Sequence, residues 1–156
     1  MSNYQASVRW QRQEQPFIDK RYSRAHSWHF DGGTVVSASS SPQVVPLPWS
    51  DPAGVDPEEA FVASLASCHM LWFLSIAAEA GWLVDEYSDD ACGVLARNDQ
   101  RQMVMTQVTL RPEVRFGGAK QPDSAELQRL HHQAHASCFI ANSVKTEVRI
   151  EAVIRA

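Results

Sequence analysis

The fold is decided by the stretch VDPEEAFVASLASC, residues 55–68. Asp56 can cap a helix, because its side-chain oxygen can accept a hydrogen bond from a free N–H group of the first turn. Pro57 suits the first helical position, where no N–H donor is needed. Glu58 and Glu59 complement the positive end of the helix dipole. We therefore predict that a helix begins at Pro57.

The residues that follow determine how long this helix is. Residues 60–78 contain no Asp, Glu, Lys or Arg, and Gly81 is well placed to end the helix. A helix over about residues 57–80 is long enough to cross a bilayer. Its apolar run, however, contains serines, a cysteine and a histidine, and it is flanked by glutamates where a membrane helix carries basic residues. We predict a central helix that is buried within a soluble protein or between two chains, and no membrane span.

Shorter patterned segments lie on both sides of this helix. Alternating apolar and polar residues are typical of half-buried strands. Before the helix they predict strands at 4–12, 26–30 and 34–38, with a polar connector at 16–25. After the helix they predict strands at 90–97, 102–110, 112–116 and 145–154, and a second helix from 122 to 138. The order of elements predicts an α+β fold, and the length fits a single domain, 1–156.

Composition and charge exclude several functions. The net charge of −4, with scattered basic residues, argues against a nucleic-acid partner, which requires a clustered basic surface. The polar start of the chain, residues 1–15, lacks the apolar segment of a signal peptide, so we expect a cytoplasmic protein. Thiols are kept reduced there, and any disulfide among the three cysteines would be transient.

Two cysteines lie on the two predicted helices. Cys68 is near the middle of the first helix and by itself is most simply a small core residue. Cys138 lies at the end of the second helix, and the two could form a redox pair if the helices pack together. A free thiol is only slightly ionised at neutral pH and is activated by a cation or a helix N-terminus. Neither cysteine is at a helix N-terminus, so a cation would have to approach through space.

Two motifs resemble those of a known family. Residues 55–68 resemble the signature of the OsmC/Ohr family, in which a Pro-Glu helix start lies ten residues before a peroxidatic cysteine. Residues 138–143, CFIANS, resemble the second-cysteine motif of that family, at a separation of 70 residues from Cys68. The resemblance implies an OsmC-like fold, with antiparallel β-sheets around a long central helix, in an intertwined homodimer.

The resemblance also implies a chemistry. Members of the OsmC/Ohr family are thiol-dependent peroxidases that reduce organic hydroperoxides in stress responses, and the resemblance implies the same activity here. By position, Cys68 attacks the hydroperoxide and becomes a sulfenic acid, and Cys138 then closes a disulfide with it. A dithiol reductant, with lipoyl-type dithiols among the candidates, restores both thiols. The resemblance implies neither a cofactor nor a metal.

A carboxylate and an arginine complete the site that the resemblance implies. Glu58 matches the carboxylate that orients an arginine, and this arginine stabilises the thiolate and polarises the peroxide. We choose Arg24 for this role over Arg21. Residues ten apart on a straight helix are separated by about 15 Å, so Glu58 cannot reach Cys68 along its own helix. A bent helix or a second chain of the homodimer would be needed.

Two other interpretations remain open. His131 and His135 are one helical turn apart and Cys138 follows, a spacing that suits a shared metal ion, which Cys68 and His69 could complete. Such a cluster would make a metal-binding protein. Alternatively, the chain is a non-catalytic, stress-related OsmC-like binding protein. His69 departs from the resemblance, because family members more often carry an apolar residue after the cysteine.

Overall fold

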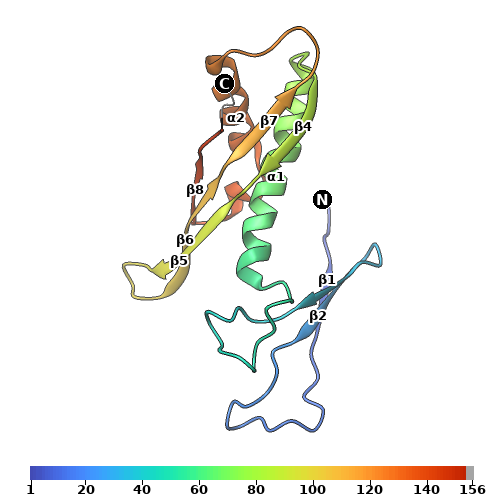
Figure 1. The fold of residues 1–156 in the computed structure, drawn as a ribbon, viewed down its shortest axis with the longest axis vertical. Coiled ribbons are helices and arrows are strands. Elements are labelled where there is room, and N and C mark those ends of the chain that lie inside the picture. Colours follow the sequence, from blue (N-terminus) through green and yellow to red (C-terminus); the bar gives the residue numbers. More distant parts are fainter. Residues whose placement is uncertain (154–156) are drawn as a thin grey trace. The chain divides into compact units, whose positions relative to one another are not determined.

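The computed structural model describes residues 1–153, drawn in Figure 1. The chain divides into two compact units, Met1–Ala60 and Phe61–Ala156. The prediction of a single domain over 1–156 stays a prediction.

The first unit contains a three-stranded antiparallel sheet (Figure 1). Its strands, in spatial order, are β1 (Ala6–Arg9), β2 (His26–Phe30) and β3 (Val35–Ala38). All three predicted strands are confirmed, although β1 is shorter than the predicted 4–12. Gly33 adopts a positive φ of 86° in the turn between β2 and β3, a conformation that glycine reaches without strain.

The connector between β1 and β2 is not simply polar, as the sequence suggested for 16–25. Phe17 and Tyr22 stack with their ring centroids 4.7 Å apart. Trp10 contacts both rings, at 5.9 Å and 5.4 Å, and its Nε1 donates to the Ser23 carbonyl at 2.8 Å. Three aromatic rings thus bury part of their surface against one another in a segment that has no secondary structure of its own.

Helix α1 (Pro57–Glu79) confirms the helix that the opening motif predicted. The Asp56 Oδ1 atom accepts from the Glu59 N–H at 2.7 Å, and the Glu59 Oε2 atom accepts from the Asp56 N–H at 3.2 Å. This reciprocal arrangement is a capping box, which satisfies two donors at the helix start. At the other end Gly81 has a φ of 79°, the left-handed conformation that terminates helices.

The second unit combines two sheets with a second helix. Its elements are β4 (Val84–Asp89), β5 (Cys92–Arg97), β6 (Met103–Leu110), β7 (Pro112–Phe116), α2 (Ser124–Ser137), the short 3₁₀ helix η1 (Ala141–Ser143) and β8 (Glu147–Ile150). β4 pairs with β7 and β5 with β6, both antiparallel. β8 pairs with β6 in parallel, because α2 carries the chain back before β8 begins. The fold is α+β with mainly antiparallel sheets, and residue 154 of the last predicted strand lies outside the described residues.

Strand β4 was not predicted. Its sequence carries Asp85, Glu86 and Asp89, and acidic residues are depleted in strands. Arg115 on β7 pairs with Asp85 at 3.0 Å and with Glu86 at 3.1 Å, so the neighbouring strand neutralises part of this charge. The partner strand, and not local propensity, accounts for β4.

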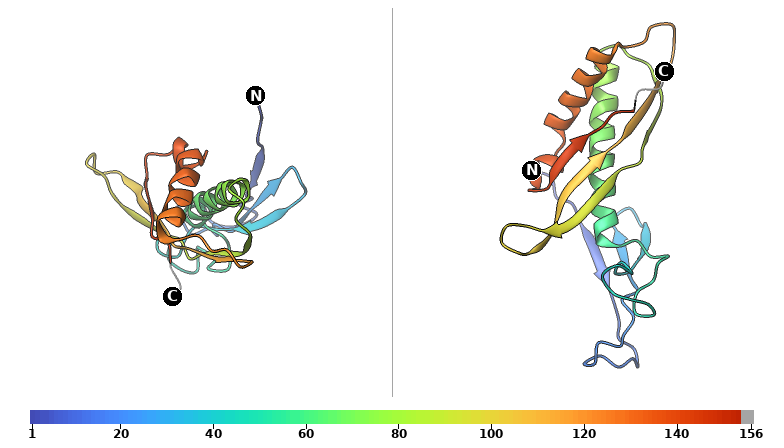
Figure 2. Two further views of the ribbon diagram at one scale, coloured as in Figure 1. Left: turned by 90° about the horizontal axis from the view of Figure 1, so that it is seen from above. Right: turned by 60° about the vertical axis from the view of Figure 1, so that its left-hand side comes forward.

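Helix α2 lies alongside α1, as both views of Figure 2 show. Every fourth residue is buried along one row of α1. These residues are Leu65, His69, Phe73 and Ala77. Phe73 and Ala77 form one buried cluster with Leu130 and Ala134 of α2. We call this contact the α1–α2 seam, and His69 is the polar member of its α1 row.

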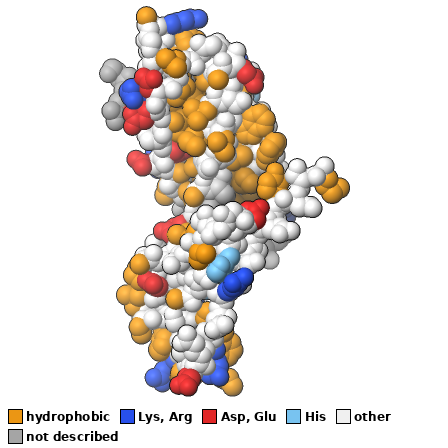
Figure 3. Space-filling model, turned by 90° about the vertical axis from the view of Figure 1, so that its right-hand side faces the viewer, with side chains coloured by type: hydrophobic (Ala, Val, Ile, Leu, Met, Phe, Trp, Pro, Cys, Tyr) orange, Lys and Arg blue, Asp and Glu red, His pale blue; other side chains and the backbone are white. Residues whose placement is uncertain are grey.

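A second row of α1 is exposed. Its members, also four apart, are Ala63, Ser67, Leu71 and Ser75. Leu71 is 62% exposed, and Figure 3 shows hydrophobic side chains gathered on one face of the second unit. By length and composition α1 could cross a membrane, a test that the core helix of a soluble protein also passes. The row of small and apolar side chains suits contact with another helix.

Candidate functional site

The structure brings Cys68 and Cys138 into contact. Cys68 lies on α1 and is half-buried, and Cys138 caps the end of α2 and is buried; both are free thiols. Burial, and then a hydrogen-bonding interaction with the Cys68 thiol, raise the pKa of the Cys138 thiol to about 11. The Ala141 N–H donates to the Cys138 Sγ atom at 3.4 Å and opposes this rise.

The two thiols therefore differ in their access to solvent. Cys138 stays protonated at neutral pH because its pKa is about 11. Cys68 is the more accessible of the two. Disulfide formation requires Cα atoms about 4.4–6.8 Å apart, and thiols that already contact each other need little rearrangement. The pair can close a disulfide once either sulfur has been oxidised.

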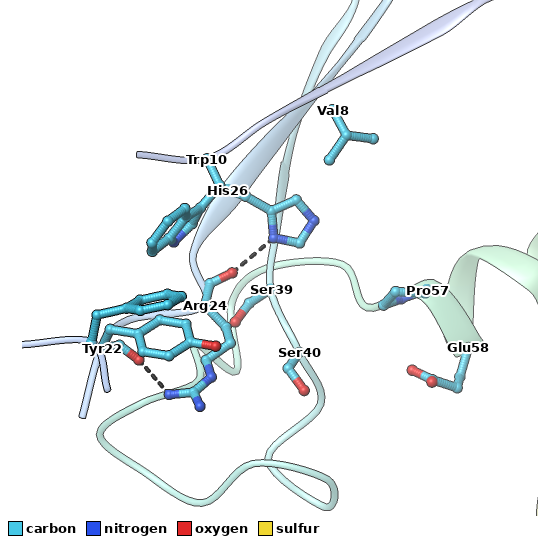
Figure 4. A pocket seen from close by; sticks show the side chains of 10 residues that line it. Val8, Trp10, Tyr22, Arg24, His26, Ser39, Ser40, Pro57 and Glu58 are labelled. Carbon is cyan, nitrogen blue, oxygen red and sulfur yellow. Dashed lines mark hydrogen bonds between the residues drawn. The ribbon is translucent and has the colours of Figure 1, made fainter. Parts of the chain in front are cut away.

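A pocket of about 470 Å³ lies in the first unit (Figure 4). Most of its lining is apolar or aromatic, with a cation and a carboxylate. Its lining residues are Val8, Trp10, Phe17, Tyr22, Arg24, His26, Ser39, Ser40, Pro57 and Glu58. Arg24 and Glu58, both predicted from the sequence, line this pocket. The side chain of Arg21 does not; it pairs with Asp19 at 3.9 Å.

Arg24 is held by several contacts. Its Nη1 donates to the Lys20 carbonyl at 2.8 Å and to the Tyr22 carbonyl, and its guanidinium carbon lies 3.8 Å from the centroid of the Tyr22 ring. Its backbone N–H donates to the Trp49 carbonyl at 2.9 Å. The Nε and Nη2 donors have no hydrogen-bond partner among residues 1–153. The cation is thus fixed in place with donors left for another group.

Arg24 and Glu58 line the same pocket from different segments, the loop before β2 and the first turn of α1. In Figure 4 the two side chains come from opposite sides of the pocket. The described residues form no Arg24–Glu58 ion pair, and the guanidinium takes its orientation from the carbonyls and from Tyr22. The role predicted for Glu58 stays a prediction.

His26 was not singled out from the sequence, yet it anchors the Arg24 backbone. The Trp28 Nε1 donates to the His26 Nε2 at 2.9 Å. An indole N–H can only donate, so His26 Nε2 carries a lone pair and the proton is on Nδ1. This Nδ1 donates to the Arg24 carbonyl at 2.7 Å (Figure 4). His26 and Trp28 are two residues apart on one strand, so their side chains lie on the same face. This spacing is the sequence signal that could have indicated their contact.

A second histidine contact lies in the α1–α2 seam. The His69 Nε2 and His131 Nδ1 atoms are 3.0 Å apart, and the two rings are nearly parallel at 8°. Burial lowers the pKa of His69 to about 3, with further lowering from His131 and His135, and burial lowers the pKa of His131 to about 4. Both rings are therefore neutral at neutral pH, and one donates to the other.

This contact argues against the metal-binding interpretation. His131 is engaged with His69 and not with a shared site that includes His135 and Cys138. Among the residues that the structure describes, no three His, Cys, Asp or Glu side chains are arranged to hold a metal ion. The prediction of a metal site at His131, His135 and Cys138 is therefore wrong. A spacing of one helical turn places residues on the same face of a helix, but it does not show which of them packs against the neighbouring helix.

Fold and thiol pair together define a class: small α+β proteins in which two packed helices bring a half-buried and a buried cysteine into contact. The sequence profile of the OsmC-like proteins matches residues 50–153, more than half of the chain. The chain belongs to the OsmC-like protein family.

Solved structures agree with this assignment. An OsmC-like protein of unknown function from Vibrio cholerae is 53% identical, with a TM-score of 0.96 over 98% of this chain and 100% of that chain. The organic hydroperoxide resistance protein OhrB of Bacillus subtilis is 17% identical, with a TM-score of 0.68 over 97% and 98%. An organic hydroperoxide resistance protein from Elizabethkingia anophelis is 14% identical, with a TM-score of 0.71 over 97% and 94%. At these lower identities the likeness is one of fold. No curated protein matches the chain.

Proposed function

We propose that the protein is a thiol-dependent peroxidase that reduces organic hydroperoxides, with Cys68 as the attacking and Cys138 as the resolving cysteine. The observation that carries the proposal is the contact between a half-buried and a buried thiol on two different helices. Relatives with the same fold are organic hydroperoxide resistance proteins, which supports the choice of substrate.

The proposed reaction proceeds in three steps. The Cys68 thiolate attacks the O–O bond and takes one oxygen as a sulfenic acid, while the second oxygen leaves and is protonated to an alcohol. The Cys138 sulfur then attacks the sulfenic sulfur, which displaces water and forms the disulfide. A dithiol reductant of the lipoyl type or similar exchanges with this disulfide and restores both thiols. Two electrons pass from the dithiol to the hydroperoxide.

Arg24 supplies the cation that a reactive thiolate needs in this proposal. Its guanidinium is held with unused donors, and such preorganised donors stabilise developing negative charge. The aromatic lining of its pocket suits the apolar part of an organic hydroperoxide.

We further propose a cytoplasmic homodimer. The exposed row of α1 gives the helix a surface to bury against a second copy, and closed two-fold dimers are the commonest assembly of soluble proteins. An intertwined arrangement would also let Glu58 act on a cysteine other than that of its own helix.

The proposal is tested by intact mass before and after one equivalent of cumene hydroperoxide. We expect the loss of two hydrogens, mapped to the peptides that hold Cys68 and Cys138. An unchanged mass, together with no consumption of the hydroperoxide, would leave the non-catalytic binding protein as the better interpretation.

Replacing Arg24 by alanine should slow the oxidation of Cys68 by about 100-fold, the usual cost of removing one charge-stabilising donor. The melting temperature should change little, because the Arg24 side chain donates to carbonyls of its own loop, those of Lys20 and Tyr22. The rate constant is measured by stopped-flow mixing with hydroperoxide. Arg21→Ala is the matched control and should react like wild type; equal slowing in both variants would contradict the assignment.

Replacing His26 by leucine should slow the same step by about fivefold, since one anchoring hydrogen bond is worth about 1 kcal/mol. His26→Asn places its amide N–H near the position of Nδ1 and should recover most of the rate. Trp28→Phe removes the indole donor and should give an intermediate value. If His26→Leu reacts at the wild-type rate, His26 does not position Arg24.

A further inference from the structure

The His69–His131 pair is a polar contact inside an apolar seam. His69 is 1% and His131 is 4% exposed, and their other ring nitrogens, His69 Nδ1 and His131 Nε2, are buried without a hydrogen-bond partner in the described residues. Phe73, the next seam residue of α1, stacks on His131 with ring centroids 4.4 Å apart. The peroxidase chemistry proposed above uses neither histidine.

A buried polar pair specifies which residues face each other. Apolar side chains pack in more than one alignment, but a polar group moved away from its partner loses about 1–3 kcal/mol. If α2 slid by one helical turn along α1, both histidines would lose their only side-chain hydrogen bond among the described residues. A single buried polar contact sets the alignment of paired helices in this way in coiled coils.

The same alignment determines whether the cysteines meet. Cys68 precedes His69 in α1, and Cys138 follows His131 by seven residues, about two turns of helix. One turn advances a helix by about 5.4 Å, whereas the Cα atoms of a disulfide must lie within a range of only about 2.4 Å. A slip of one turn would therefore separate Cys68 from Cys138.

We propose that the His69–His131 pair sets the register of α1 against α2 and thereby positions Cys68 and Cys138 for disulfide formation. The inference rests on the redox role proposed for these two cysteines. Both histidines are positioning residues, since neither has to touch the substrate or a reacting sulfur.

The test separates register from stability by replacing the pair with apolar residues. The His69→Leu/His131→Leu variant should stay folded, because apolar replacements of buried polar pairs are often neutral or stabilising. Wild type and variant are equilibrated with mixtures of reduced and oxidised glutathione. Each closure passes two electrons from the two thiols to oxidised glutathione and yields two reduced glutathiones. Peptide mass spectrometry quantifies the Cys68–Cys138 disulfide.

We expect the equilibrium constant for disulfide closure to fall at least tenfold in the double variant, while urea unfolding shows no loss of stability. His69→Gln keeps an N–H near the position of Nε2 and should retain most of the wild-type constant. Leu130→Val is the matched control, because it lies in the same seam and removes volume without touching the pair. It should lower stability and leave the equilibrium constant unchanged.

Several outcomes would overturn the inference. A wild-type constant in the double variant would show that the pair does not set the register. A comparable fall in Leu130→Val would show that general packing, and not the pair, controls closure. A wild-type protein that closes the disulfide with glutathione but leaves hydroperoxide unreduced would refute the peroxidase alone. A wild-type protein that forms no such disulfide would refute both.

Discussion

Cys68→Ser is expected to lower the turnover of cumene hydroperoxide by on the order of 1,000-fold or more, as for other nucleophile replacements. A serine hydroxyl stays protonated at neutral pH and is a poor nucleophile toward the O–O bond. Turnover is measured as peroxide consumption with an excess of a dithiol reductant. Retention of even a tenth of the wild-type rate would move the attacking role away from Cys68.

Two further cysteine variants test the resolving step and provide a control. Cys138→Ser should still consume about one equivalent of hydroperoxide, because the half-buried thiol remains, but it should stop at the sulfenic acid. Cys92→Ser is the control, since Cys92 is an exposed thiol on β5 whose Sγ lies 3.8 Å from the Gly93 carbonyl, and the variant should turn over like wild type. A sulfenic acid is trapped with dimedone and detected by mass.

Local signals explain why helix α1 could be predicted from the sequence. The capping box of Asp56 and Glu59 and the left-handed Gly81 depend on residues within one turn of each end. For the same reason the turn at Gly33 and the strands β2 and β3 were predicted close to their observed bounds. Strand β4 could not be predicted from local signals, because its acidic residues are neutralised by Arg115, which is 30 residues away from Asp85.

The candidate site depends more heavily on contacts between distant residues. The two cysteines could be selected from motifs, but only the packing of α1 on α2 shows that their thiols touch. His69 and His131 are 62 residues apart in the sequence. The helical spacing of His131 is compatible with a metal site and equally with a hydrogen bond to His69. Arg24 could be chosen by position, whereas its anchoring by His26 follows from a tautomer that Trp28 imposes. Sequence patterns indicate which residue types are available, and tertiary packing decides which of them meet.

The buried histidine pair should make the protein sensitive to acid. In the unfolded chain both histidines titrate near their usual pKa of 6.5, but in the fold burial lowers the pKa of His69 to about 3 and that of His131 to about 4. The unfolded state therefore binds more protons between these values, and the free energy of unfolding falls as the pH falls below about 6.5. The stability is fully present above that pH and is lost progressively toward the folded pKa values.

The expected loss in the free energy of unfolding is large. At about pH 5 each histidine costs about 2 kcal/mol relative to neutral pH, or about 4 kcal/mol for the pair if the two act independently. Urea unfolding of wild type and of His69→Leu/His131→Leu, at about pH 7.5 and about pH 5 and at equal protein concentration, measures this difference. The double variant should lose less stability on acidification, because it has no histidine at these positions to protonate on unfolding. Equal losses in the two proteins would mean that both rings take up protons within the folded state, and that the seam tolerates a charge which its burial should exclude.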